Sequence, residues 1–336
     1  MRSTIKDVAK LAGVSVKTVS RVINNEPNVR PAMQELVQKA VDELGFKKNP
    51  MASALRGQRS FIITLLYSNP NPGYVLELQN GAIAQANEQG YNLQIQPCDH
   101  NQPNLIQNIE TLITHARQDG ILLTHPLCDN PELIKLLEDN KIPFARISPF
   151  NRDHNSPFVC SDDEQAAYDI TKFLISLGHT DIAIIKGHKD FGATPKRFEG
   201  YQRALTEVDM PVYDELVKQG EFTFESGEIC ARQLLTQEHR PTAIFACNDY
   251  MAAAVLKVAA QMKINIPSEL SVAGYDDAPV SQQIWPSITT VKQPICDIAK
   301  HAVKKLILHM QKQDYSEVQT QFPCKLVLRN STSLKA

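Results

Sequence analysis

The sequence predicts an α/β protein with a small all-helical head at its N-terminus and a larger, two-lobed, doubly wound α/β domain after it. Apolar residues at helical spacing, interrupted at a glycine, fill the first 45 residues. From Phe61 onward, short β-rich apolar runs alternate with amphipathic helical stretches, which is typical of parallel sheets covered by helices. The alternation runs through two rounds, so two similar lobes are expected in this chain of 336 residues.

The head begins with two short amphipathic helices joined by a tight turn. Apolar residues recur at helical spacing from Ile5 to Ala12 and again from Val16 to Ile23. Gly13 tolerates the positive φ that such a turn needs, and Ser15 is a good N-cap for the second helix. This is the pattern of a helix-turn-helix, in which the second helix carries the side chains that read a DNA groove.

A third helix is expected over residues 31–44, because Pro31 suits a first helical turn and Gly45 ends the apolar pattern. It would complete a small three-helix core, with Leu36 among its apolar positions. A short further helix fits residues 50–57, between a proline and a glycine. We therefore divide the chain into a head with this last helix, residues 1–59, and a second domain, residues 60–336.

The charges of these two parts differ in sign. Residues 1–59 contain 11 Lys/Arg and 5 Asp/Glu, a balance of +6, whereas the remainder has 24 Lys/Arg and 32 Asp/Glu, a balance of −8. A basic head on an acidic body is typical of a nucleic-acid-binding module attached to a sensor.

The second domain divides into elements at regular intervals. The first round predicts strands at Phe61–Leu66, Leu93–Gln96, Ile121–Leu123, Phe144–Ile147 and Val159–Cys160, and helices at Leu76–Gln89, Leu105–Arg117 and Pro131–Asn140. The second round predicts helices at Glu164–Leu177, Lys196–Val208, Ser226–Leu235 and Tyr250–Met262, and strands at Ile182–Ile185, Leu216–Lys218, Ala243–Ala246 and Ser271–Gly274. A helix at Pro294–Gln311 and a strand at Lys325–Leu328 finish the chain.

The run Thr4–Asn24 agrees with the signature T-I-x-D-V-A-x-x-A-G-V-S-x-x-T-V-S-R-V-x-N, apart from Leu11, where a smaller or polar residue is commoner. The chain thus resembles the lactose/galactose repressor (LacI/GalR) family, and the resemblance extends to Leu326–Thr332. It implies a repressor of carbohydrate-utilisation genes, released from a palindromic operator by a sugar or sugar phosphate. It also implies a periplasmic-binding-protein-like domain, with an N-lobe of about 60–160 and 291–321 and a C-lobe of about 161–290 and 322–336.

The resemblance and the helix pattern together assign candidate contacts to operator DNA. Lys17 and Arg21 can pair with guanine edges in the major groove, and Val16 can touch a thymine methyl. The helix at residues 50–57 resembles the family's hinge helix, in which Leu55 would act as an apolar wedge in the minor groove. The complete candidate set is Thr4, Ser15, Val16, Lys17, Thr18, Ser20, Arg21, Asn24, Ala52 and Leu55.

Ligands of open α/β sheets bind at the carboxyl ends of strands, where several polar and aromatic residues are expected. Arg197 begins a motif, Arg197-Phe198-Glu199-Gly200-Tyr201, similar to the family's R-x-x-G-[FWY]. Neither Arg197 nor Asp276 is expected in a core, whereas Tyr275 is, and Asp249 is half structural. The candidate effector-binding set is Tyr74, Arg197, Phe222, Asn248, Asp276 and Gln293, with Asp99, Thr124 and His125 as weaker candidates.

Other functions are less compatible with this sequence. A periplasmic binding protein needs a signal peptide and has no use for a basic helix-turn-helix. An enzyme of this fold class would show a G-x-G-x-x-G, P-loop or nucleophile-elbow motif, and none is present. The seven cysteines and nine histidines show no metal-site spacing, so no metal or cofactor is expected.

A cytoplasmic homodimer without a membrane segment is therefore expected. The sequence is compatible with a mono- or disaccharide effector or with a phosphorylated sugar. Release from DNA on effector binding is favoured over strengthened binding.

Overall fold

The computed structural model describes residues 3–23, 29–46 and 59–335. The chain separates into two compact units, residues 1–61 and 62–336, each of which is described by itself. The predicted helix at residues 50–57 lies outside the described residues, as do the predicted DNA contacts Asn24, Ala52 and Leu55.

The head consists of α1 (Ile5–Ala12), α2 (Val16–Ile23) and α3 (Pro31–Glu43). Gly13 ends α1 in the left-handed region, with φ 65°. Asp7 accepts hydrogen bonds from the backbone N–H and the hydroxyl of Thr4 at 2.8 and 2.7 Å, so Thr4 and Asp7 close the first turn of α1. The buried core of the head is Val8, Ala9, Val19, Val37 and Ala40.

One predicted core position of the head is wrong. Leu36 on α3 is 47% exposed, because α3 turns the face that carries Val37 and Ala40 toward α1 and α2. The pattern of apolar residues on this helix is therefore wider than the face that it buries.

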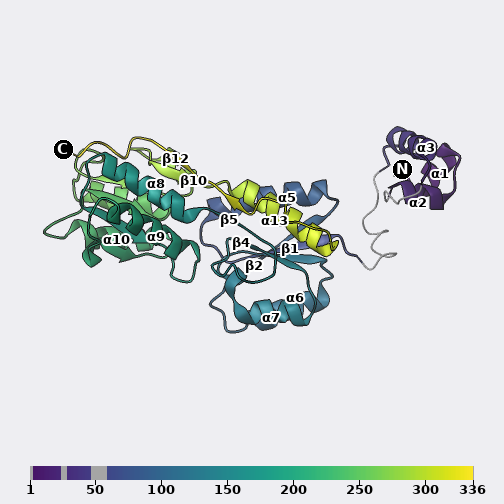
Figure 1. Ribbon diagram of the computed structural model, residues 1–336, viewed down its shortest axis with the longest axis horizontal. Coiled ribbons are helices and arrows are strands. Elements are labelled where there is room, and N and C mark those ends of the chain that lie inside the picture. Colours follow the sequence, from purple (N-terminus) through teal and green to yellow (C-terminus); the bar gives the residue numbers. More distant parts are fainter. Residues whose placement is uncertain (1–2, 24–28, 47–58, 336) are drawn as a thin grey trace. The chain divides into compact units, whose positions relative to one another are not determined.

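The first lobe is built on a parallel sheet in the order β11-β5-β4-β3-β1-β2. Figure 1 shows α6 and α7 on one face of this sheet and α5 and α13 on the other. The strands are β1 (Ile62–Tyr67), β2 (Asn92–Pro97), β3 (Gly120–Leu123), β4 (Phe144–Ile147), β5 (Phe158–Ser161) and β11 (Gln321–Phe322). The helices are α5 (Pro72–Glu88), α6 (Leu105–His115), α7 (Pro131–Asp139) and α13 (Ile295–Met310), with a 3₁₀ turn at Leu127–Asp129.

The second lobe repeats this design with a smaller parallel sheet, in the order β7-β6-β8-β9. Its helices pack in two pairs, α8 with α9 and α10 with α11. The strands are β6 (Ile182–Lys186), β7 (Val217–Gln219), β8 (Ala243–Ala246) and β9 (Ser271–Ala273). The helices are α8 (Asp163–Ser176), α9 (Ala193–Thr206), α10 (Phe224–Leu235), α11 (Asp249–Gln261) and α12 (Val280–Gln283), with a 3₁₀ turn at Asp214–Leu216.

The chain passes between the two sheets more than once. It leaves the first sheet after β5, and α13 returns to pack on β3, β4 and β5. The strand β10 (Thr290–Lys292) pairs antiparallel with β12 (Lys325–Val327), and β11 pairs with β5. The first sheet is therefore completed by residues from the end of the chain, which fixes the two lobes beside a shared set of crossing segments.

Two helices begin three or four residues earlier than the sequence predicts. Asn71 caps α5 and Pro72 occupies its first turn, so α5 starts four residues before Leu76 and includes Tyr74. Likewise α9 starts at Ala193, three residues before Lys196, and Arg197 lies on this helix, as predicted. Among the described residues, no helix combines the length and the apolar character that spanning a membrane requires.

Candidate effector cleft and DNA-reading surface

Among the described residues, the predicted DNA contacts lie on or beside α2, apart from Thr4, which precedes α1. Lys17 is exposed and Arg21 is half-buried. Ser15 caps α2, because its Oγ accepts the Thr18 N–H at 3.1 Å. Val16 packs partly against the head core, so only part of its side chain is open to a partner. Of the other candidates, Thr4 and Ser15 are exposed, and Thr18 and Ser20 are half-buried.

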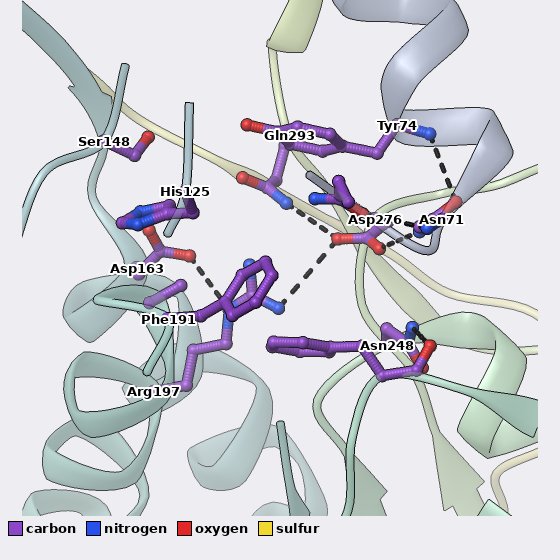
Figure 2. Close-up of a pocket in the computed structure, with 13 residues that line it drawn as sticks. Asn71, Tyr74, His125, Ser148, Asp163, Phe191, Arg197, Asn248, Asp276 and Gln293 are labelled. Atoms are coloured by element: carbon purple, nitrogen blue, oxygen red, sulfur yellow. Dashed lines mark hydrogen bonds and ion pairs between the residues drawn. The ribbon is translucent and has the colours of Figure 1, made fainter. Parts of the chain in front are cut away.

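One cleft in the second unit collects all six of the predicted effector-binding residues (Figure 2). The residues around it follow the carboxyl ends of strands in both lobes, where open α/β sheets bind their ligands. Thirteen residues line the cleft: Asn69, Asn71, Tyr74, His125, Ser148, Asp163, Phe191, Ala193, Arg197, Phe222, Asn248, Asp276 and Gln293.

The guanidinium of Arg197 lies between two carboxylates. Its Nε donates to Asp163 Oδ1 at 2.9 Å, and a terminal nitrogen donates to the Cys247 carbonyl. The same nitrogen lies 3.9 Å from Asp276 Oδ1, and the guanidinium carbon lies 3.6 Å from the centre of the Tyr275 ring. Burial by itself would lower the pKa of Arg197, but Asp163, Tyr275 and Asp276 raise it overall, so this side chain stays charged.

The carboxylate of Asp276 is aimed at the cleft by an unusual backbone conformation. Asp276 and Asp277, shortly after β9, have φ values of 107° and 56°, a region that few non-glycine residues adopt. Asp276 accepts hydrogen bonds from Asn71 Nδ2 at 2.8 Å and from Gln293 Nε2 at 2.7 Å. Burial raises the pKa of Asp276 to about 6, against the lowering effect of Arg197 and these two amides.

Asn71 joins the two lobes directly. Its Oδ1 accepts the backbone N–H groups of Gly73 and Tyr74 at 3.0 and 3.2 Å, which caps α5 in the first lobe. Its Nδ2 donates to Asp276 in the second lobe. A helix cap of one lobe therefore holds a carboxylate of the other, as the dashed lines in Figure 2 show.

Asn248 makes more hydrogen bonds within the protein than the sequence predicts. It is the N-cap of α11, with its Oδ1 accepting the Met251 N–H at 2.9 Å. Its Nδ2 donates to the Phe222 carbonyl at 2.8 Å, so one amide N–H remains for a ligand. The Phe222 ring lies so close to Gly187 that a Cβ there would come within 1.8 Å of it.

The aromatic residues form the apolar part of the cleft. Tyr74 lies in the first turn of α5, and its ring lies beside Gln293 in Figure 2. Burial raises the pKa of Tyr74, so its hydroxyl keeps its proton and can donate. Phe222 packs edge-on against Phe191, with 5.5 Å between ring centres. These rings offer apolar surface of the kind on which the C–H face of a sugar can lie.

His125 brings an unsatisfied polar atom to the cleft. Its Nδ1 lies 3.6 Å from both Cys128 Sγ and Asp129 Oδ2. Its Nε2 is buried and has no hydrogen-bond partner among the described residues. Burial lowers the pKa of His125, so the ring is neutral at pH 7. A buried polar atom of this kind normally has a partner, which points to a ligand group here.

Several cleft residues were absent from the predicted set. The strongest are Asn71 and Asp163, and both had a local signal: an Asn-Pro helix start after β1 and an acidic helix start after β5. Asn69, Ser148, Phe191 and Ala193 had none, since only the tertiary fold brings their loops together. Of the weaker candidates, Thr124 is fully buried and does not line the cleft, and Asp99 lies on a neighbouring groove.

The expectation that Arg197 and Asp276 avoid the core is wrong. Arg197 is 4% exposed, and the Asp276 side chain is 7% exposed. Tyr275 is fully buried, as expected, and Asp249 is buried with hydrogen bonds to Thr290 and Ala278. The charged centre of the cleft is thus part of the folded interior, which makes it important for stability.

The cleft is nearly closed in this conformation. Its volume is about 40 Å³, which is enough for a few waters. Pockets for small ligands usually enclose ~300–1,000 Å³. In this conformation the cleft is therefore too small for a sugar ring.

Comparison with known proteins identifies both units. Residues 4–49 match the family model "Bacterial regulatory proteins, lacI family", and residues 171–332 match "Periplasmic binding protein-like domain". The chain is 31% identical to catabolite control protein A of Priestia megaterium, over 99% of this chain and 100% of that protein.

Solved structures agree with this relationship. The complex of the transcriptional regulator CelR with cellobiose has a TM-score of 0.74 at 28% identity, covering 98% of this chain and 100% of that one. The lac repressor dimer bound to operator and the anti-inducer ONPF has a TM-score of 0.76 at 25% identity, with 99% and 100% covered. On this evidence, the chain belongs to the LacI family of bacterial transcriptional regulators.

Proposed function

We propose that this protein is a homodimeric repressor of carbohydrate-utilisation genes that leaves a palindromic operator when an uncharged sugar occupies the cleft. The family membership supports the DNA-binding part, and the cellobiose complex of CelR supports a sugar as the ligand of the related fold. The protein would act in the cytoplasm, where its operator lies. Two heads related by a two-fold axis would read half-sites about one helical turn apart.

The charges of the residues that line the cleft favour an uncharged effector. Arg197 is the one cation among the residues that line the cleft, since His125 is neutral at pH 7. Asp163 and Asp276 already oppose that cation, which leaves the lining with one excess negative charge. A phosphate or carboxylate on the effector would meet these carboxylates without a free cation to receive it.

Neutral hydroxyls suit the same groups well. A hydroxyl can donate to Asp276 in place of Asn71 or Gln293, and another can bond to His125 Nε2. Because the Asn71–Asp276 bond joins the lobes, replacing it changes the interaction between them. That exchange would couple effector binding to the head, with a coupling free energy of ~1–3 kcal/mol as in other allosteric proteins.

A ligand screen tests the chemical class of the effector. Uncharged mono- and disaccharides should raise the melting temperature of the purified protein, and their phosphorylated or carboxylated counterparts should not. If only phosphorylated sugars raise the melting temperature, the proposal of an uncharged effector is wrong.

Calorimetric titration of the best sugar then tests the site. Asp276→Asn should weaken binding about ten- to a hundred-fold, because a hydrogen bond to a charged group is worth ~1.5–3 kcal/mol. The matched control is Asp297→Asn on α13, whose carboxylate is 55% exposed and outside the cleft. Equal affinity of the wild type and Asp276→Asn would rule out this site.

A gel shift with the DNA upstream of the chain's own gene tests the regulatory part. The wild type should give a specific shift that the sugar abolishes. Asp276→Asn should give the same shift at sugar concentrations that release the wild type. A shift strengthened by the sugar would reverse the proposed direction of control.

A further inference from the structure

A second groove, beside the cleft, carries side chains that the proposed function does not use. It has a volume of about 450 Å³ and shares Asn69 and Phe191 with the cleft. His100 lines it from the first lobe, after β2, and His188 lines it from the second lobe, after β6. Asp190 lies beside these two histidines. One ligand atom of each of these three side chains lies within 4.8 Å of the other two.

His100 has one ring nitrogen engaged and the other available. Its Nδ1 lies 2.9 Å from Ser68 Oγ, and that hydroxyl also accepts the His100 backbone N–H at 3.2 Å. Its Nε2 is buried and has no hydrogen-bond partner among the described residues. With the proton on Nδ1, facing Ser68, the lone pair of Nε2 is available to a cation.

His188 has a partner on each ring nitrogen. Its Nε2 lies 3.3 Å from Glu221 Oε2, and its Nδ1 lies 3.9 Å from Asp190 Oδ2. That Nδ1 accepts the Asp190 backbone N–H at 3.2 Å, so a metal ion on this nitrogen would have to replace that hydrogen bond. Histidines that bind metals usually have a carboxylate or another polar partner on their second ring nitrogen. Glu221 and Ser68 occupy that position on the two rings.

We propose that His100, His188 and Asp190 bind one divalent transition-metal ion, of which Zn²⁺ is the type case, and that this ion joins the two lobes beside the cleft. Two imidazoles and a carboxylate are a set that Zn²⁺ and its neighbours accept, with water as a further ligand, whereas Mg²⁺ and Ca²⁺ prefer oxygen alone. Zinc–ligand distances of ~2.0–2.2 Å require a small approach of the three side chains. The sequence shows no sign of this site because 88 residues separate His100 from His188.

The Phe191 ring connects the proposed metal site with the effector cleft. The Phe191 ring lies 5.4 Å from that of His188 and 6.4 Å from that of His100, and it also packs on Phe222 and His125. A metal ion that draws the two histidines together would restrict the ring that forms one wall of the cleft. Only this coupling rests on the proposed function, since the metal site itself is independent of it.

A binding titration tests the site. Tag-free, full-length protein is titrated with Zn²⁺ against a chromophoric chelator, with the thiols kept reduced. The wild type should bind one ion, and His100→Gln and His188→Gln should each weaken this binding at least tenfold. Asp190→Asn should weaken it less than either, because it removes a charge and keeps an oxygen ligand.

Two control variants make the titration decisive. His239→Gln removes an exposed histidine outside the cluster, and Cys98→Ser removes a thiol that lines the same groove. Both should bind Zn²⁺ like the wild type. Unchanged affinity in His100→Gln, or loss of the ion in Cys98→Ser, would overturn the assignment. Each variant is first shown to melt like the wild type without metal.

Hydrogen exchange tests the joining of the lobes. Zn²⁺ should slow amide exchange at residues 97–102 and at residues 187–193 in the wild type, because the two segments belong to different lobes. In His100→Gln neither segment should be protected at the same Zn²⁺ concentration. Protection of residues 187–193 alone in the wild type would mean that the ion is held by the second lobe only, and the bridge would be wrong.

Discussion

The polar side chains of the head and those of the cleft differ in their exposure to solvent. On the head, Thr4, Ser15 and Lys17 are exposed and come from a stretch of 14 consecutive positions. In the cleft, Arg197 is 4% exposed, and the Asn71–Asp276 hydrogen bond joins residues 205 positions apart. The head offers its donors to a large partner that approaches from outside. The cleft keeps its donors bound to one another until a small ligand replaces some of those bonds.

This difference has an energetic consequence. Truncating an exposed side chain of the head removes contacts to a partner and leaves the fold nearly unchanged. Truncating a buried charge of the cleft also leaves its partners buried and unpaired, which costs far more. The following predictions test that contrast, from the largest expected effect to the smallest.

Arg197→Ala should lower the free energy of unfolding by ~3–5 kcal/mol, because Asp163 and Asp276 would remain buried without their cation. Urea denaturation, followed by a spectroscopic signal of the second unit, measures this loss. The control is Arg203→Ala on the same helix, whose ion pair with Glu164 is exposed and worth at most ~1 kcal/mol. Equal losses in the two variants would remove the contrast between buried and exposed charges.

The protonation of Asp276 should make the stability depend on pH. Its pKa is raised from 3.8 to about 6, so the folded protein binds this proton more tightly than the unfolded chain. The contribution of this group is therefore largest in acid and falls as the pH rises through about 4 to 6. The decrease should be about 3 kcal/mol, since each pKa unit corresponds to ~1.4 kcal/mol.

Other groups titrate in the same range, so the measurement is a difference. The free energy of unfolding of the wild type minus that of Asp276→Asn should decrease between pH 4 and pH 7 and stay constant above it. A difference that rises with pH would mean that the buried carboxylate is stabilised as the anion, contrary to its raised pKa.

Arg21→Ala should weaken operator binding by ~1–3 kcal/mol per half-site, because a bidentate contact to guanine contributes a binding free energy of this size. Binding to scrambled DNA should change much less, so the ratio of the two affinities at one salt concentration is the measured quantity. The control is Arg30→Ala, an exposed arginine that precedes α3. If the ratio is the same in the wild type and Arg21→Ala, α2 is not the recognition helix.

Thr4→Ala should have the smallest effect on the fold. It removes the hydrogen bond from the Thr4 hydroxyl to Asp7 in the cap of α1 and keeps the one from the Thr4 backbone N–H, so the loss should be at most ~1 kcal/mol. The loss should appear in the melting of the head and leave sugar affinity unchanged. A change in sugar affinity would show that the two units are coupled through α1.

Local sequence determined the head almost completely. Its helices are eight to thirteen residues long, and their starts and ends follow from Thr4, Gly13, Ser15 and Pro31 through hydrogen bonds within a few positions. Leu36 is the exception, since its exposure depends on how α3 packs on the other two helices. The α/β alternation likewise indicated nearly every strand and helix of the second unit, because each is defined by its own apolar period.

The six predicted effector-binding residues could be named because strand ends and the Arg197 motif are visible along the chain. What those residues do was decided by the tertiary structure. Arg197 and Asp276 became a buried ion pair, and the Asn248 amide became a donor to the Phe222 carbonyl, because these partners come from distant segments. Asn71, Asp163 and the pair His100 and His188 were missed for the same physical reason: a hydrogen bond or a pair of ligands between lobes depends on packing, and packing leaves no period in the sequence.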